Sequence, residues 1–401
     1  MNISKSIRAG LLAAGLLLLC HPDAQAQRER KQSAVRIKFD YVGEPHDGRV
    51  LVASGGGYAN PLMGKFKTRG LFGYLDMLGG IAIPLEYDYG SDFRDGYAVV
   101  GVGEPEQRRF GIIDTTGRRV VPCMYADVLP FSDGRALLLE SRETGRKYGY
   151  ADTTGRIAIP MEYDYASVFR DGTAVVGRGS WSRDEQGRWS FDGKAGVIDT
   201  TGRLIIPLEY DDASVFSEGL AAVGREGKYY VLWGYVDRSG ELVIPMRYYE
   251  AGDFQDGLAL VSRVMQGAPR YGFIDKTGDE VIPCQYDYAK PFAEGLAWVG
   301  VGVYPDCAYW LIDRTGRNVL SYKVYDLNDS GRYGHVSAAV PDENGVLRYG
   351  LLSKTGRVVV PFEYDHITIF SERDPKAGRM VERGSAERAG KSVGFTVRKR
   401  D

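Results

Sequence analysis

The stretch that decides the fold is Tyr271-Gly272-Phe273-Ile274-Asp275-Lys276-Thr277-Gly278. Its first five residues are rich in the aromatic and β-branched types that favour a short strand. Asp275 to Gly278 predicts a tight turn, because the aspartate can accept backbone N–H bonds and the glycine can adopt a positive φ. Glu280 to Ile282 is expected to return as a second strand. Pro283 should end that strand, since proline cannot donate to a ladder.

This pattern recurs with a period of about 38 residues. The opening glycine recurs at spacings of 38, 38, 47, 38, 38 and 78 residues, as Gly73, Gly111, Gly149, Gly196, Gly234, Gly272 and Gly350. A proline follows each glycine eleven residues later, as Pro84, Pro122, Pro160, Pro207, Pro245, Pro283 and Pro361. A tyrosine follows each proline by three residues, as Tyr87, Tyr125, Tyr163, Tyr210, Tyr248, Tyr286 and Tyr364. A phenylalanine comes six residues later, as Phe93, Phe131, Phe169, Phe216, Phe254, Phe292 and Phe370.

The second half of each unit predicts one more strand. Tyr286 to Phe292 should be an irregular connection whose two aromatics fill the seam between units. Glu294-Gly295 predicts a turn and Leu296 to Val301 a third strand, which makes each unit a three-stranded antiparallel meander. No segment carries apolar residues at helical spacing over three turns, so we expect an all-β protein.

We assign structural roles in the repeat to the landmark residues of three units. They are Gly111, Asp114, Gly117, Pro122, Tyr125 and Phe131 in one unit, Gly149, Pro160, Tyr163 and Phe169 in the next, and Gly272, Asp275, Gly278, Pro283, Tyr286 and Phe292 in a third.

These landmarks resemble those of the WG-repeat family, also called KWG repeats. The shared features are an aromatic-Gly pair, an Asp-x-x-Gly turn, a proline, a Tyr-Asp pair and a Phe-x-x-Gly, over roughly residues 35–397. The literal Trp-Gly pair occurs once, as Trp233-Gly234; elsewhere the aromatic residue is Phe72, Phe110, Tyr148, Tyr271 or Tyr349, and in one unit Ala195 takes its place. The resemblance implies a scaffold found in many exported and cell-envelope proteins, with no catalytic residues of its own.

The chain from residue 27 to 401 is interpreted as a single repeat domain. Units are expected to start near residues 72, 110, 148, 195, 233, 271, 309 and 349. The unit near 309 is degenerate, because Trp310 replaces the opening glycine and Ser321 the proline. Residues 35–52 resemble the back half of a unit, and residues 392–398 a front strand.

The two terminal fragments are complementary, which bears on the overall shape. Together they would form one composite unit and close the array, which would remove two exposed sheet edges. We therefore favour a propeller-like closed ring. The alternative is an open, curved β-solenoid whose fragments act as caps.

The N-terminal segment predicts export. Lys5 and Arg8 precede an apolar run from Leu11 to Leu19, which is too short to span a bilayer, and Ala24-Gln25-Ala26 follows. We interpret residues 1–26 as a cleavable signal peptide, so the mature chain would begin at Gln27 in the periplasm, on the cell surface or in the medium.

A lipoprotein signal is the alternative interpretation of this segment. Lipid attachment at Cys20 would follow such a signal, although Leu19 stands where lipoprotein signals carry glycine or alanine.

Composition excludes several classes of partner. Removing the signal moves the formal net charge only from −2 to −3, and basic and acidic residues are interspersed. This pattern gives no electrostatic footprint for nucleic acid. No other apolar stretch approaches the length of a membrane span. Cys123, Cys284 and Cys307 are interpreted as small buried residues, because none belongs to a C-x-x-C pair.

The sequence carries no motif for catalysis, metal or cofactor. His46, His335 and His366 are isolated, and neither a nucleophile elbow nor a phosphate-binding loop is present. The turn aspartates offer too few oxygen ligands for calcium. The aspartates after the landmark tyrosines, Asp88, Asp164, Asp211, Asp287 and Asp365, are interpreted as caps of local turns. The alternative is a groove of Tyr-Asp pairs that binds sugars.

The clearest difference between units is a nine-residue excess before Gly196. We predict an extended hairpin there, and insertions in repeat arrays often lie on the binding face. The candidate binding residues are Trp181, Arg183, Arg188, Trp189 and Phe191. The competing interpretation is that these aromatics only pack the hairpin onto its neighbour.

The function predicted is therefore that of an exported, non-enzymatic binding or scaffold protein with a protein or glycan partner at the cell envelope. The alternatives are a carbohydrate-active or other hydrolase with carboxylates at a ring centre, and a structural spacer without a ligand.

Overall fold

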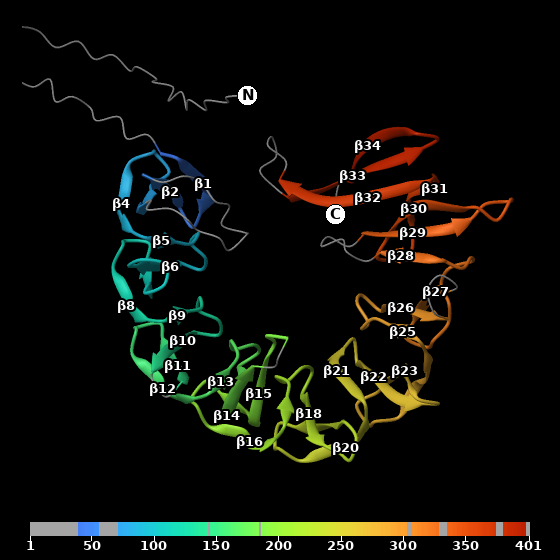
Figure 1. Ribbon diagram of the computed structural model, residues 1–401, viewed down its shortest axis with the longest axis horizontal. Helices are drawn as coiled ribbons and strands as arrows, with labels where there is room; N and C mark the ends of the chain where they lie inside the picture. The colour runs from blue at the N-terminus through green and yellow to red at the C-terminus, as the bar shows by residue number, and fades with distance from the viewer. Residues whose placement is uncertain are drawn as a thin grey trace, which may run out of the picture.

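A computed structural model describes residues 39–55, 71–142, 145–183, 186–302, 307–328, 335–373 and 380–397. The predicted signal peptide, with Cys20 and Gln27, lies outside these residues, as does the side chain of Trp189. All regular structure in the described residues is β, in 34 strands that form nine antiparallel sheets (Figure 1). The predicted all-β repeat fold is confirmed.

The strands of the first five sheets follow one another along the chain. The first sheet contains β1 (Tyr41–His46), β2 (Arg49–Ser54), β3 (Leu71–Leu75) and β4 (Ile81–Tyr87). The second contains β5 (Tyr89–Gly90), β6 (Tyr97–Val102), β7 (Arg109–Asp114) and β8 (Arg119–Tyr125). The third contains β9 (Asp127–Val128), β10 (Arg135–Arg142), β11 (Gly145–Asp152) and β12 (Ile157–Tyr163). The fourth contains β13 (Tyr165–Ala166), β14 (Thr173–Arg183), β15 (Trp189–Asp199) and β16 (Leu204–Tyr210). The fifth contains β17 (Asp212–Ala213), β18 (Leu220–Glu226), β19 (Val231–Asp237) and β20 (Leu242–Tyr248).

The last four sheets include two that have only three strands. The sixth contains β21 (Glu250–Gln255), β22 (Leu258–Met265), β23 (Ala268–Ile274) and β24 (Glu280–Tyr286). The seventh contains β25 (Tyr288–Ala289), β26 (Leu296–Val301) and β27 (Ala308–Asp313). The eighth contains β28 (Asp326–Asn328), β29 (His335–Pro341), β30 (Leu347–Ser353) and β31 (Val358–Tyr364). The ninth contains β32 (His366–Arg373), β33 (Met380–Arg388) and β34 (Lys391–Val397).

Each sheet is shared between two sequence units. In the second sheet, β5 and β6 end the unit that starts near residue 72, whereas β7 and β8 open the unit that starts near residue 110. The prediction of one three-stranded meander per unit is corrected in this respect. A two-residue strand such as β5 also lies in the connection that we expected to be irregular. Because every unit supplies strands to two sheets, neighbouring sheets are joined by the repeat itself.

The prediction that the landmark proline ends the returning strand is wrong. The proline lies inside that strand. Phe110 and Ile112 of β7 face Tyr125 and Val121 of β8. One residue of β7 therefore lies opposite three residues of β8, and β8 bulges around Pro122. A Cβ on Gly111 would lie 2.4 Å from the Val121 carbonyl oxygen, so only glycine permits this approach. β8 is an edge strand, where the missing N–H of proline breaks no ladder.

The core lies in the seams between neighbouring sheets. Tyr163 and Phe169 are buried in one cluster with Tyr150 and Ile198, which come from the third and fourth sheets. The rings of Tyr150 and Phe169 meet edge to face with centroids 4.8 Å apart, and the Tyr150 hydroxyl donates to the Ser167 carbonyl at 2.7 Å. The tyrosine and phenylalanine landmarks therefore fill the seam, as predicted.

The array is an open arc, and the closed ring that we favoured is not formed. In Figure 1 the sheets run from β1–β4 in blue to β32–β34 in red, and the two ends face one another across a gap. β34 pairs with β33, and β1 pairs with β2. The physical reason is that no described residue supplies a fourth strand to the ninth sheet. The open, curved alternative is therefore the observed arrangement.

The fragments and the degenerate unit follow the sequence pattern. The β1–β2 hairpin takes the place of the back half of a unit in the first sheet, and β34 takes the place of an opening strand in the ninth. In the seventh sheet β27 has only isolated bridges, Tyr309 to Val324 and Ile312 to Asn318, in place of a returning strand. Trp310 occupies the position at which a glycine elsewhere lets the bulge approach, so the strand cannot form there.

Candidate binding site

The variable hairpins are where the units differ most. β14 and β15 have eleven residues each and stay paired from Thr173 opposite Asp199 out to Arg183 opposite Trp189. The extended hairpin predicted from the nine-residue excess is therefore present. Gly179 faces Gly193, and a Cβ on Gly179 would lie 2.2 Å from the Asp192 carbonyl oxygen, so this pair lets the two backbones approach closely.

The aromatic side chains of the hairpin fold onto their own sheet. The Trp181 ring lies 5.3 Å from the Phe191 ring and 6.2 Å from the Tyr165 ring, measured between centroids. The Trp181 indole N–H donates to the Asp164 carbonyl at 2.8 Å, and the side chain is 37% exposed. Trp181 therefore anchors the hairpin and leaves about a third of its surface to solvent.

The two predicted arginines lie near the tip of the hairpin. The Arg183 guanidinium donates to the Gly187 carbonyl at 2.9 Å, and Arg188 contacts the Gln186 side chain at 3.4 Å. These contacts hold the tip together. Of the five predicted binding residues, the structure brings Trp181 and Phe191 together and places both arginines at the tip; the side chain of Trp189 is not among those described.

A groove of about 310 Å³ separates this hairpin from the β18–β19 loop of the next sheet. The hairpin contributes Phe191, Asp192 and Gly193. The other side is formed by Asp211 and by residues 226–231, which include Tyr229 and Tyr230. We call this cavity the hairpin groove.

Asp211, which lines the hairpin groove, forms an ion pair with Lys194. The Lys194 ammonium lies 2.5 Å from Asp211 Oδ1, and the Glu226 backbone N–H donates to Asp211 Oδ2 at 2.6 Å. Partial burial acts to raise the pKa of Asp211, but the hydrogen bonds from Lys194 and Glu226 outweigh it, so this pKa lies below its usual value. Asp211 is therefore a charged, fixed acceptor that also orients the β18–β19 loop.

Two tyrosines form the outer wall of the hairpin groove. Tyr229 is 80% exposed, and the Lys228 ammonium lies 4.9 Å from its ring centroid. Tyr230 packs edge to face on Tyr249 at 5.0 Å, while its carbonyl accepts the Gly227 N–H at 2.9 Å and closes the loop. The sequence reasoning missed both residues. The available signal was a Tyr-Tyr pair in a loop next to the insertion.

The aspartates after the landmark tyrosines serve the backbone. The N–H groups of Gly103, Gly179, Glu226, Gly302 and Ala389 donate to Asp88, Asp164, Asp211, Asp287 and Asp365 at 2.6 to 3.1 Å. Four of these aspartates also pair with the cation two residues before the opening glycine, in Lys147–Asp164, Lys194–Asp211, Arg270–Asp287 and Arg348–Asp365. These contacts support the interpretation that the aspartates cap local turns, and they do not favour the alternative of a sugar-binding groove of repeated Tyr-Asp pairs.

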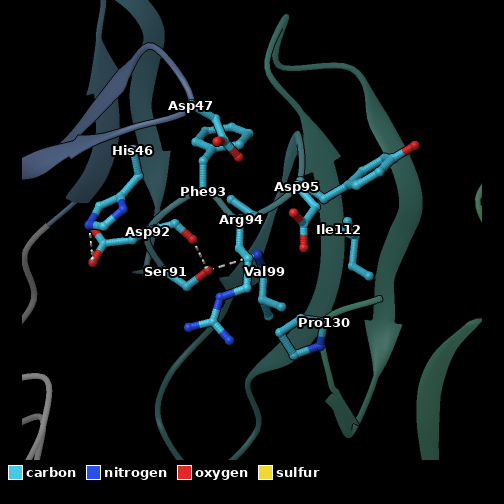
Figure 2. Close-up of a pocket in the computed structure, with 12 residues that line it drawn as sticks. His46, Asp47, Ser91, Asp92, Phe93, Arg94, Asp95, Val99, Ile112 and Pro130 are labelled. Carbon is cyan, nitrogen blue, oxygen red and sulfur yellow. Dashed lines mark hydrogen bonds and ion pairs between the residues drawn. The ribbon is translucent and has the colours of Figure 1, made fainter. Parts of the chain in front are cut away.

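A second cavity, of about 430 Å³, lies between the first two sheets (Figure 2). His46 Nε2 lies 3.8 Å from Asp92 Oδ2 at one end, and Pro130 and Ile112 lie at the other. The Gly96 N–H donates to Asp47 Oδ2 at 2.8 Å, and the Val99 N–H to the Ser91 hydroxyl at 3.0 Å. Its polar side chains therefore hold this seam together, and we assign it a structural role.

Other features that suggest chemistry are few in the part of the chain described. Cys123, Cys284 and Cys307 form no disulfide with one another, and burial raises the pKa of the Cys284 thiol to about 11. No group of three or more His, Cys, Asp or Glu side chains is arranged to hold a metal among the described residues. The same residues contain no helix that is long and apolar enough to cross a membrane.

The family model described as "WG containing repeat" matches seven segments that together cover more than half of the 401 residues. They are residues 72–104, 110–138, 148–179, 196–229, 233–263, 271–302 and 349–372. No curated protein matches the sequence.

Three solved structures that resemble this one at low similarity are peptidases. Dipeptidyl peptidase 4 of Porphyromonas gingivalis is 8% identical with a TM-score of 0.40, over 86% of this chain and 64% of that one. A prolyl endopeptidase is 11% identical with a TM-score of 0.35, over 74% and 52%. An acylaminoacyl peptidase of Pyrococcus horikoshii is 12% identical with a TM-score of 0.31, over 76% and 58%. The chain thus spans between about half and two thirds of the length of these proteins.

Proposed function

The chain belongs to the family of WG containing repeat proteins, and on that premise we propose that it is an exported, non-catalytic binding protein that presents the hairpin groove to a glycan of the cell envelope. The observation that carries the proposal is Tyr229, which stays 80% exposed beside a cavity of about 310 Å³. An aromatic ring held out from an otherwise regular array suits binding.

The chemistry of the hairpin groove favours a sugar polymer as its occupant. An exposed aromatic face can stack on the apolar C–H face of a sugar ring. Asp192 and Glu226 are exposed at the groove and can accept hydrogen bonds from hydroxyl groups, while Lys228 can donate them. A few polar groups around an aromatic surface are typical of small-molecule and glycan sites.

A non-catalytic role agrees with the use made of the carboxylates. Asp211, which lines the hairpin groove, is already committed to Lys194 and to the Glu226 amide. Glycoside hydrolysis needs a pair of carboxyl groups, one of which must be able to give a proton near neutral pH. An ionised Asp211 cannot be the group that gives this proton.

Replacing Tyr229 by alanine tests the proposal. The exported chain and its Tyr229→Ala variant would be assayed for co-sedimentation with purified peptidoglycan and for affinity to β-1,4-linked oligosaccharides. We expect the variant to lose at least tenfold in affinity, since aromatic anchors commonly contribute 2 kcal/mol or more, while its melting temperature stays within about 1 °C.

The matched control is Leu78→Ala, which removes a 96% exposed side chain from the β3–β4 turn. This variant should bind like the parent chain. The proposal would be contradicted if Tyr229→Ala bound with the same affinity as the parent chain. It would also be contradicted if the parent chain bound neither peptidoglycan nor the oligosaccharides. Release of reducing sugar by the parent chain would contradict its non-catalytic part.

Export rests on the N-terminal sequence and has its own test. We expect the intact mass of the secreted protein to correspond to a chain that begins at Gln27. A mass that corresponds to a lipid-modified chain beginning at Cys20 would replace the signal-peptide interpretation by lipid anchoring, and an unprocessed chain would contradict export.

A further inference from the structure

The outer edge of β34 differs from the outer edges of the sheets that end in a returning strand. The returning strands β4, β8, β12, β16, β20, β24 and β31 each carry a proline and a bulge, features that protect sheet edges from pairing. β34 has neither proline nor, after Lys391, any charged residue, and Val393 is 57% exposed. An unprotected edge of this kind is suited to pairing with another strand.

Gly394 indicates which strand the edge is built to receive. At the opening glycines of the complete units, a Cβ would lie 2.4 to 2.7 Å from the nearest atom of the returning strand. Gly394 occupies the same position in β34, yet the only atom within 4 Å of its Cβ would be the Gly384 carbonyl oxygen, at 4.0 Å. The glycine that admits a returning strand is thus present at an edge where no described residue provides that strand.

The chain carries a matching sequence just before β1. Residues 33–41, Ser-Ala-Val-Arg-Ile-Lys-Phe-Asp-Tyr, align with residues 81–89, Ile-Ala-Ile-Pro-Leu-Glu-Tyr-Asp-Tyr, which contain the returning strand β4. The structure supports this register. The Gly55 N–H donates to Asp40 Oδ2 at 2.8 Å, as the Gly103 N–H does to Asp88 Oδ2 at 2.7 Å.

We propose that β34 of one molecule pairs with residues 33–39 of a second copy of this chain. The second copy would add its first sheet to the end of the arc and repeat the seam that already joins each pair of sheets. Pairing within one chain would instead bring the first sheet against the ninth across the gap in Figure 1 and change the stacking of the sheets between them. The contact is head-to-tail, so it generates rings or filaments.

Gly394→Ala isolates this contact. An alanine here meets no described atom of its own molecule closer than 4.0 Å, whereas it would clash with an incoming returning strand. We expect the weight-average mass of the exported chain in sedimentation to rise with concentration to multiples of the subunit mass. The variant should stay at one subunit at every concentration, and at a concentration where the parent is also a single subunit the two should have the same melting temperature. Ser392→Ala, on the same strand, is the control and should assemble like the parent.

Two outcomes would overturn the proposal. One is a parent chain that remains a single subunit at every concentration, and the other is a Gly394→Ala variant that assembles like the parent.

Cross-linking distinguishes a second copy from the same chain. Ile83 pairs with Tyr74 in the first sheet, so the alignment places Val35 opposite Phe395. Copies with Val35→Cys would be mixed with copies that carry Phe395→Cys and oxidised mildly. Disulfide-linked dimers are expected, and they should be absent when Leu78→Cys replaces Phe395→Cys. If a chain with both substitutions forms only a disulfide within itself, the strand pairs within one chain and the proposal fails.

Discussion

At the scale of single residues, the glycines and aspartates of the repeat have separate physical roles. Gly234 lets the bulge of β20 approach, because a Cβ there would lie 2.5 Å from the Ile244 carbonyl oxygen. Asp275 holds the β23–β24 turn by accepting the Thr277 hydroxyl at 2.6 Å and the Thr277 and Asp279 N–H groups at 2.9 and 3.1 Å. One role is steric and the other electrostatic, so they predict different experiments.

Gly234→Ala should lower the free energy of unfolding by about 1–3 kcal/mol or more, because the added methyl forces the β19 and β20 backbones apart. Urea unfolding measures this change. Gly394→Ala is the matched control, since its surroundings are open, and should change the unfolding free energy by less than about 0.5 kcal/mol. Equal effects of the two substitutions would contradict the steric explanation.

The turn aspartates predict a loss of stability in acid. The hydrogen bond from Thr277 and those from the backbone hold the pKa of Asp275 below its ordinary value of 3.8. The unfolded chain therefore binds a proton before the folded chain does as the pH falls. The stabilisation is fully present above about pH 4 and is lost as the pH falls through the lower, folded-state pKa.

Asp275→Asn tests this at one turn, because asparagine keeps an acceptor but does not titrate. Between pH 5 and pH 2 the melting temperature of the variant should fall less than that of the parent chain. Glu104→Gln, an exposed carboxyl in the β6–β7 loop, is the control and should follow the parent. Parallel curves for parent and Asp275→Asn would show that this turn contributes nothing to acid lability.

At the scale of elements, the extended hairpin is both anchored and exposed. Trp181 packs on Tyr165 and Phe191 and donates to Asp164, which fixes the orientation of Phe191 at the hairpin groove. Trp181 and Phe191 pack on one another, as the packing interpretation predicts, whereas the binding interpretation stays a prediction. Trp181 packs, while Phe191 and Tyr229 line the groove.

Trp181→Ala should consequently weaken glycan binding through misplacement of the hairpin, with a small loss of stability. Hydrogen exchange should rise in residues 179–193, because this part of the paired strands β14 and β15 extends beyond the seam. Exchange in the third sheet should remain unchanged. Unfolding of the whole fourth sheet in this variant would mean that the hairpin is part of the core.

The sequence predicted the individual turns and long strands better than it predicted how the strands combine into sheets. Asp275 and Gly278 define a turn locally, and the excess before Gly196 defines the hairpin, so both could be predicted. The bulge at Pro122 could not, because it depends on how closely β7 and β8 approach. Two-residue strands such as β5 are too short to produce an alternating pattern. From the sequence alone, Tyr229 could not be distinguished from the many tyrosines that fill the seams. The hairpin groove could not be predicted either, because it is lined by separate segments of the sequence that only the fold brings together.

At the scale of the whole molecule, each sheet depends mainly on its neighbours. Phe254 packs on Tyr235 at 5.0 Å in a cluster that draws on strands of the fifth and sixth sheets. The Gly172 N–H donates to Asp133 Oδ2 at 2.8 Å, and the Gly295 N–H to Asp256 Oδ2 at 2.8 Å, so carboxylates also link neighbouring sheets. An array held together in this way behaves as a one-dimensional chain of interacting units.

Phe254→Ala tests this organisation. It should cost about 3–5 kcal/mol in the affected seam. Hydrogen exchange should accelerate from β18 to β24 and stay unchanged in the second sheet. Uniform acceleration across all nine sheets would contradict nearest-neighbour coupling.

We propose that the regular array presents one binding surface, the hairpin groove, where its units differ. The most direct test is hydrogen exchange of the chain with and without soluble peptidoglycan fragments. We predict slower exchange in residues 191–193 and 226–231, which line the hairpin groove, and no change at the equivalent loop between β22 and β23. Protection at the β22–β23 loop instead, or no protection anywhere, would contradict it.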